Sequence, residues 1–154
     1  MAEVADERQN PKKDYIFAVG KHKESVARLR LYQTLKSGLS VAGQEVKKGE
    51  MYVNNKKIEE YFSGETATAK YLEPFKLTNN LDKFTLTFRI IGGGKSGQLD
   101  AAIHAISRAL SLMDLKNRQI LKKRGFLTRD ARVRERRKVG MGGKARRKRQ
   151  SPKR

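Results

Sequence analysis

Residues 91–96, Ile-Gly-Gly-Gly-Lys-Ser, have the composition of a phosphate-binding turn. A strand, a glycine-rich turn and a Lys-Ser pair opening a helix resemble the P-loop of nucleotide-binding proteins. That motif needs another glycine five positions before the last glycine of the turn, where this chain has Arg89. The turn is also too short to surround a phosphate chain. We therefore interpret it as a flexible connection, or as a site where Lys95 and the free N–H groups of the helix bind a single phosphate group.

The two histidines lack the neighbours that catalysis would require. His22 follows Gly20 in a predicted turn, where its ring could add a hydrogen bond or stack on a base. His104 lies off the apolar face of a predicted helix, one turn from both Asp100 and Arg108, which indicates a solvated pairing along that helix. No catalytic site, metal site or cofactor is predicted, because no matching base accompanies the carboxylates at Glu59, Glu60, Glu65 and Glu73.

Positive charge is the dominant feature of the sequence. The net charge is +20, and residues 116–154 hold 18 of the 36 Lys and Arg residues but only two acidic residues. A compact chain with this charge repels itself, so a polyanionic partner is expected to neutralise it. The absence of cysteine excludes disulfides, thiolate nucleophiles and Cys-ligated zinc.

The composition of the basic C-terminal segment favours structured RNA as that partner. Arginine outnumbers lysine between Arg124 and Arg149, and its planar guanidinium can bind phosphate bidentately and stack on bases. Glycines in the segment allow the backbone to approach RNA closely. A generic polybasic arm, of the nuclear-localisation or heparin-binding kind, is the alternative. The predicted RNA-binding residues here are Arg118, Lys122, Lys123, Arg124, Arg129, Arg132, Arg134, Arg136, Arg137, Lys138, Lys144, Arg146, Arg147, Lys148 and Arg149.

A second group of cations lies near the N-terminus of the predicted domain. Two lysines flank the histidine in the turn after Gly20, and two arginines share one face of the strand that follows. Cations grouped on one face form a continuous footprint for phosphates. The predicted RNA contacts of the folded part are Lys21, His22, Lys23, Arg28, Arg30 and Lys95.

Strands are predicted mainly in the first part of the chain. Residues 15–20 begin with an apolar strand that the glycine ends. Residues 25–32 and 83–91 alternate apolar and polar side chains, which is typical of half-buried strands. Residues 51–53 predict a short strand entering a turn, and the glycine-containing stretch 36–50 predicts a loop or an irregular hairpin.

Helices are predicted mainly in the second part. Apolar residues spaced by three or four predict an amphipathic helix over 96–113, and a shorter helix over 117–124 ends at the next glycine. Two short helices are predicted at 58–62 and 66–72, the second followed by Pro74 as a helix breaker. Early strands and late helices favour an α+β fold, with helices on one face of a mixed sheet and a long basic C-terminal tail.

The chain divides into three parts by composition. Residues 1–13 are polar and predicted to be flexible, residues 14–125 form the α+β domain, and residues 126–154 form an extended basic tail. The tail has too few apolar residues for a core of its own. From Thr128 it could reach ~90 Å when fully extended, whereas the domain has an expected radius of gyration of about 14 Å. With no signal peptide, transit peptide or membrane span in the sequence, a cytoplasmic location is expected.

Four blocks of sequence stand out together. They are residues 20–28 (GKHKESVAR), 92–98 (GGGKSGQ), 101–110 (ending in SRAL) and 125–130 (GFLTRD), with the basic run after the last block. In this order they resemble the bacterial-type ninth protein of the small ribosomal subunit. The resemblance covers nearly the whole chain from Tyr15 onward, and the combination is specific although each block alone is weak.

The resemblance implies the α+β fold of domain two of ribosomal protein S-five and a structural, non-enzymatic role in the small ribosomal subunit. It further implies binding to the 3′ major domain of the ribosomal RNA, in the head of the subunit, beside neighbouring head proteins. The tail of such proteins reaches the peptidyl-site tRNA, and Lys153 and Arg154 occupy the contacting positions here. No membrane and no small-molecule substrate is implied.

Two departures from the family pattern are visible. The stretch from Gln33 to Glu50 is longer than is usual and could carry a lineage-specific contact. Pro152 lies directly before Lys153, where it removes a backbone donor. Two rival functions are a histone-like protein that compacts nucleic acid without specificity, and a nucleotide-dependent enzyme built on the glycine turn.

Overall fold

The computed structural model describes residues 14–33, 40–41, 44–133, 136 and 138–139. Within these ranges a five-stranded sheet has the order β1-β2-β7-β5-β6. The β5–β7 pair is parallel and the other pairs are antiparallel, so the sheet is mixed. The strands are β1 Tyr15–His22, β2 Ser25–Tyr32, β3 Ser40–Val41, β4 Gln44–Glu45, β5 Met51–Val53, β6 Lys56–Lys57 and β7 Thr85–Ile91; the helices are α1 Ile58–Tyr61, α2 Glu65–Leu77, α3 Lys95–Met113 and α4 Leu115–Lys123.

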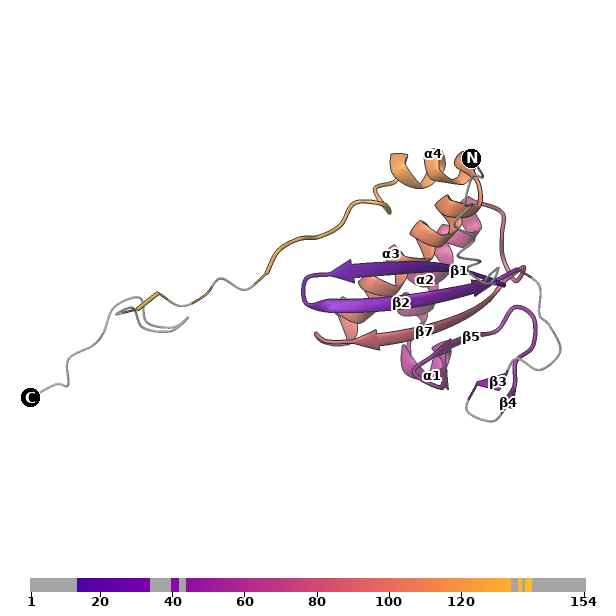
Figure 1. Cartoon of the computed structure of the whole chain (residues 1–154), viewed down its shortest axis with the longest axis horizontal. Coiled ribbons are helices and arrows are strands. Elements are labelled where there is room, and N and C mark those ends of the chain that lie inside the picture. The colour runs from indigo at the N-terminus through magenta and orange to yellow at the C-terminus, as the bar shows by residue number, and fades with distance from the viewer. Residues whose placement is uncertain (1–13, 34–39, 42–43, 134–135, 137, 140–154) are drawn as a thin grey trace, which may run out of the picture.

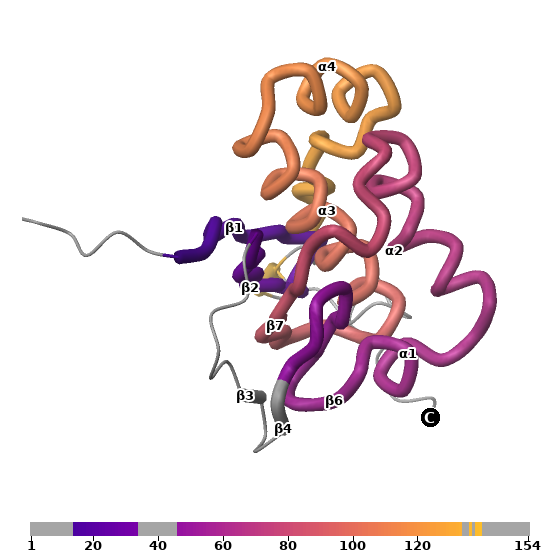
Figure 2. Tube along the Cα trace, turned by 90° about the vertical axis from the view of Figure 1, so that its right-hand side faces the viewer, coloured from indigo at the N-terminus to yellow at the C-terminus, as the bar shows by residue number. Residues whose placement is uncertain are grey.

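The helices cover one face of this sheet. Figure 1 shows β1, β2 and β7 side by side in front of α2 and α3, and Figure 2 shows both helices on the same side of the strands. The long helix α3 packs over β1 and β2, with α4 folded back against it. The predicted α+β fold, with a mixed sheet and helices on one face, is therefore confirmed.

The core lies between α3 and the inner face of the sheet. Alternate residues of β2 and β7 point inward and are buried, among them Leu29, Leu31 and Phe88. Helix α3 contributes the residues that its apolar spacing predicted, such as Ile106 and Leu110, which are fully buried. The apolar faces that the sequence predicted for the strands and for α3 therefore pack together in one core.

Gly20 was predicted to end the first strand, and this prediction is wrong. β1 continues through Gly20 to His22, and Gly20 pairs with Ala27 of β2. A Cβ atom at Gly20 would lie 2.0 Å from the carbonyl oxygen of Ala101 and 2.4 Å from the backbone nitrogen of Ala105. The glycine is therefore required because the backbone of α3 approaches β1 closely, and the chain turns only at Lys23-Glu24.

Pro74 was predicted to break a helix, and this prediction is also wrong. Helix α2 extends through Pro74 to Leu77, and the proline ring is buried together with Tyr71 and Phe75. Proline inside a helix costs one backbone hydrogen bond and clashes with the preceding turn. Burial of these three neighbouring side chains offsets that cost.

The stretch from 36 to 50 was predicted to be a loop or irregular hairpin. Its described part includes the two-residue strands β3 and β4, which pair antiparallel. In the described residues no helix is long and apolar enough to cross a membrane.

Candidate nucleic-acid interface

The face of the sheet opposite α3 is not covered by any helix of the described chain. Strand alternation places Phe17, Arg28, Arg30 and Arg89 on it, because Arg30 pairs with Phe17 and Arg28 pairs with both Val19 and Arg89. All three arginines and the phenylalanine are exposed. We call this surface, with Ile91 beside Arg89, the open face.

The open face brings together two predicted RNA contacts, Arg28 and Arg30, and one residue that was missed. Arg89, which stands where a P-loop would have a glycine, was not among the predicted RNA contacts. Its place in an alternating strand indicated an outward side chain, but its register with Arg28 depends on strand pairing across the chain. The guanidinium of Arg30 lies 5.1 Å from the ring centroid of Tyr15, a cation–π contact.

A carboxylate near the far edge of the sheet is already satisfied. Glu50 accepts hydrogen bonds from the Lys47 N–H at 2.9 Å and the Tyr52 hydroxyl at 3.0 Å, and its other oxygen lies 3.2 Å from Lys57 Nζ. The Lys47 N–H is the main cause that lowers the pKa of Glu50, while burial raises the pKa of Tyr52. Glu50 is therefore bound to neighbouring residues of its own segment and not to the arginines of the open face.

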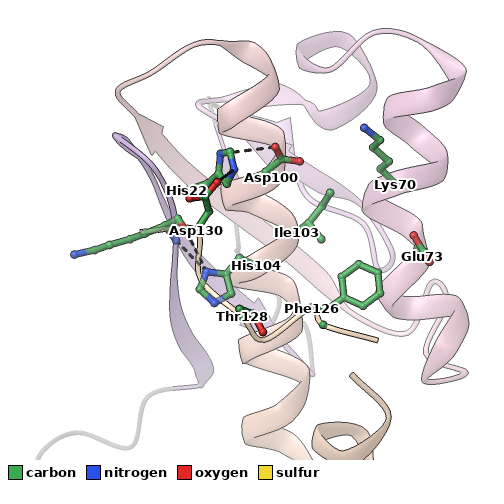
Figure 3. A pocket seen from close by; sticks show the side chains of 11 residues that line it. His22, Lys70, Glu73, Asp100, Ile103, His104, Phe126, Thr128 and Asp130 are labelled. Atoms are coloured by element: carbon green, nitrogen blue, oxygen red, sulfur yellow. Dashed lines mark hydrogen bonds and ion pairs between the residues drawn. The ribbon is translucent and has the colours of Figure 1, made fainter. Parts of the chain in front are cut away.

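The segment after α4 is joined to the β1–β2 hairpin by Asp130 (Figure 3). Its carboxylate oxygen Oδ2 lies 3.2 Å from His22 Nε2, and its carbonyl oxygen accepts a 3.2 Å hydrogen bond from the Lys23 N–H. On the other side of the ring, His22 Nδ1 lies 3.7 Å from Asp100 Oδ2. We call the contacts of Asp130 with His22 and Lys23 the latch.

Arg132 also binds the carboxylate of Asp130. Its Nε and Nη2 atoms donate to Asp130 Oδ1 and Oδ2 at distances between 2.6 and 3.0 Å. This guanidinium is the main cause that holds the pKa of the Asp130 carboxyl well below its usual range. Asp130 is thus ionised at neutral pH, and the segment 126–132 stays in contact with the domain, where Phe126 and Leu127 pack against the core.

The predicted roles of the two histidines change with this geometry. The His22 ring is directed at Asp100 and Asp130 and is largely covered, with 19% of its side chain exposed. Its RNA contact stays a prediction, whereas its observed contacts lie within the protein. β1 extends through His22, so this residue lies at the end of a strand.

His104 does not pair along its helix with Asp100 and Arg108, and that interpretation is wrong. Its Nδ1 lies 3.3 Å from both the backbone nitrogen and the carbonyl oxygen of Lys21, and Arg108 donates to the carbonyl oxygen of Val19. β1 is an edge strand, and these two side chains of α3 satisfy backbone groups along its free edge. Burial is the main cause that lowers the pKa of His104.

The glycine turn between β7 and α3 is a packed connection. Gly92 and Gly93 have positive φ angles, and Cβ atoms there would lie 2.6 Å from the Glu24 carbonyl oxygen and 2.1 Å from Ser25 Oγ. Ser25 and Gln98 both donate to the carbonyl oxygen of Gly92, at 3.2 and 3.1 Å. The glycines therefore serve close contact with the β1–β2 turn.

The side chain of Lys95 contacts Tyr61, the last residue of α1. Its Nζ is 3.5 Å from the ring centroid of Tyr61 and 3.3 Å from the Tyr61 carbonyl oxygen. In the described residues no group of three His, Cys, Asp or Glu side chains is arranged to hold a metal. Binding of one RNA phosphate by Lys95 stays a prediction.

The predicted contacts on α4 and in the tail divide by position. Helix α4 carries exposed cations and ends with lysines in its last turn. Its N-terminus is capped by Asp114, whose side chain accepts a 2.9 Å hydrogen bond from the Lys116 N–H. Of these predicted contacts, the ones in the described part are all exposed: Arg118, Lys122, Lys123, Arg124, Arg129, Arg132, Arg136 and Lys138. The ones outside it are Arg134, Arg137, Lys144, Arg146, Arg147, Lys148, Arg149, Lys153 and Arg154.

Comparisons with known proteins identify the family to which this chain belongs. Residues 20–154 match the model of a family described as ribosomal protein S9/S16. The chain is 43% identical over 131 residues to the small ribosomal subunit protein uS9 of Maridesulfovibrio salexigens, which covers 85% of this chain and 91% of that protein. The chain therefore belongs to the bacterial-type ribosomal protein S9 family and is a structural, non-catalytic constituent of the small subunit of the cytoplasmic ribosome.

Proposed function

We propose that this protein binds the 3′ major domain of the small-subunit ribosomal RNA, in the head of the subunit, and that its tail reaches the peptidyl-site tRNA. The observation that carries the proposal is the uneven charge. Residues 116–154 carry a net charge of +16, whereas the other 115 residues carry +4. A chain segment with this charge gains free energy by releasing the counterions of RNA phosphates.

The folded domain and the tail have separate parts in this function. The domain docks through the exposed cations of its hairpin and open face, chiefly Lys21, Lys23, Arg28 and Arg30. The latch fixes where the tail leaves the domain, next to the β1–β2 turn, as Figure 1 shows for the segment after α4. The tail cations then neutralise closely packed RNA strands beyond the domain.

The tip of the tail has the most specific task. Lys153 and Arg154 contact the tRNA, with Arg154 as the main contact because a guanidinium binds phosphate bidentately. Pro152 restricts the backbone next to them. Neighbouring head proteins border the protein in the assembled subunit.

Replacement of Arg154 by alanine tests the tRNA contact. We expect Arg154→Ala to weaken peptidyl-site tRNA binding by reconstituted small subunits, with assembly of the subunits unchanged. Arg149→Ala removes the same charge five residues earlier and is the matched control, expected to leave tRNA binding at its original strength. A defect in assembly with normal tRNA affinity in the Arg154 variant would contradict the proposed contact.

A further inference from the structure

We propose that the open face binds a single-stranded segment of ribosomal RNA, with backbone phosphates on Arg28, Arg30 and Arg89 and an unstacked base on Phe17. This rests on the proposed function, RNA binding by the folded domain, and adds the surface, the conformation of the RNA and two residues. The two added residues are Phe17 and Arg89.

The first observation is an uncompensated pair of like charges. Arg28 and Arg89 lie directly opposite each other on β2 and β7, and Arg30 lies two residues along from Arg28 on the same face. Like charges in directly opposed positions of a sheet are destabilising. No carboxylate in the described ranges forms an ion pair with any of the three. A polyanion that bridges them would relieve this repulsion.

The second observation is exposed apolar surface beside the charges. Phe17 has 48% of its surface exposed and pairs with Arg30, and Ile91 has 51% exposed and follows Arg89 by two residues. Near the end of the same face, the rings of Tyr15 and Tyr32 lie 5.6 Å apart. An exposed ring on a sheet, next to a guanidinium group, is the kind of surface on which single-stranded bases stack.

These two observations together select single-stranded RNA over the other occupants. A duplex presents its phosphates but hides its base faces, so it would leave Phe17 without a partner. A protein partner would use the aromatic and arginine side chains, but it would have to supply several carboxylates to this one small surface. Single-stranded RNA supplies both a phosphate for each arginine and a base for the ring.

Loss of the two opposed charges tests the electrostatic part. The full-length protein carrying Arg28→Gln and Arg89→Gln is titrated with a 3′ major domain fragment of small-subunit ribosomal RNA at several salt concentrations. Each single-strand phosphate contact contributes about −0.7 to the slope of log affinity against log salt. We therefore expect the slope of the double variant to be less negative than that of the wild type by about 1.4. The control, Lys70→Gln with Lys76→Gln on α2, removes the same charge from the helix side and is expected to keep the original slope.

Replacement of the ring tests the stacking part. Base stacking on an aromatic side chain contributes about 1–3 kcal/mol, so we expect Phe17→Ala to weaken binding about tenfold with the salt slope unchanged. Phe17→Leu keeps apolar area without a ring and should show nearly the same loss. Far-UV circular dichroism confirms that each variant is folded. Full affinity in Phe17→Leu would overturn the stacked base.

Cross-linking identifies the occupant directly. A photoreactive benzoyl-phenylalanine at position 17, in reconstituted small subunits, should cross-link to an unpaired nucleotide of the ribosomal RNA. Cross-linking to a ribosomal protein, to a base-paired nucleotide or to nothing would overturn the proposal. Wild-type protein and a tail deletion are measured in the same titrations, so absence of any RNA binding would refute the proposed function, whereas unchanged slopes in the double variant alone would refute the open face.

Discussion

His22 Nε2 lies 3.2 Å from Asp130 Oδ2, and this contact joins a hairpin near the N-terminus to the start of the basic tail. The two residues are separated by most of the folded domain in sequence. Asp130 is one of only two acidic residues among residues 116–154. Its carboxylate is held by His22 and Arg132 together, so a single acid fixes the departure point of a polycation.

We expect Asp130→Asn to release the start of the tail. The amide keeps the size of the side chain but loses the charge that pairs with His22 and Arg132. Trypsin should then cleave after Arg129 and Arg132 several times faster in the free protein. The reason is that the rate of proteolysis follows the population of molecules in which the latch contacts are broken. Glu59→Gln on α1 removes an exposed carboxylate elsewhere and should leave these rates unchanged. Equal cleavage rates in both variants would show that the latch does not hold the tail.

The pH dependence of stability should report on His104. Its pKa is lowered from the usual value of 6.5, mainly by burial, so the folded state binds a proton less readily than the unfolded state. Its contribution to stability is present above pH 6.5 and is lost as the pH falls through the lowered pKa. We expect the wild type to lose more thermal stability between about pH 7.5 and about pH 5 than His104→Gln does. Parallel curves for the two proteins would rule out this role.

Gly20→Ala should be the most damaging of the conservative changes. A methyl group there would lie within 2.0 Å of the Ala101 carbonyl oxygen and would force α3 away from β1. We expect a loss of about 3 kcal/mol or more in the free energy of unfolding, measured with urea. The loss is large because the clashing atoms belong to the backbone of α3, which cannot move aside as a flexible side chain can. Gly94→Ala, where nothing lies within 4 Å of the added Cβ and φ is negative, is the control and should cost far less. Similar losses in both would refute the close-packing explanation.

Arg89→Thr should stabilise the free protein. Removal of one of two directly opposed guanidinium groups relieves a repulsion of about 0.2–1 kcal/mol, and threonine suits a strand. The same change should weaken binding to ribosomal RNA. A lower melting temperature for the free variant would indicate that Arg89 has a stabilising contact within the protein.

The elements of the fold were largely predictable from the sequence because their signals are local. The alternation in β2 and β7 and the apolar spacing in α3 each reflect one buried face, so residues such as Leu29 and Ile106 were assigned correctly. Gly20 and Pro74 were misinterpreted because a local rule assigned them to a turn and a helix end. In both places the deciding contact is tertiary: α3 against β1, and the burial of Pro74 with Phe75.

The candidate site was predicted less completely. Outward-facing Arg28 and Arg30 followed from strand alternation, but the pairing of Arg28 with Arg89 depends on the register of two distant strands. The partners of His22 and His104 come from a helix and from a segment far along the chain. No spacing in the sequence contains that information, so only the folded arrangement shows that both histidines serve contacts within the protein.

In the proposed function, the tail supplies most of the electrostatic attachment to ribosomal RNA. The most direct test of this attachment is a salt titration of wild-type protein and of a variant lacking residues 129–154, with the same 3′ major domain fragment. Each phosphate contact in the tail contributes about −0.7 to the slope of log affinity against log salt. We predict that the deletion removes most of the slope and leaves a small remainder from the folded domain. A slope nearly equal to that of the wild type would contradict the account.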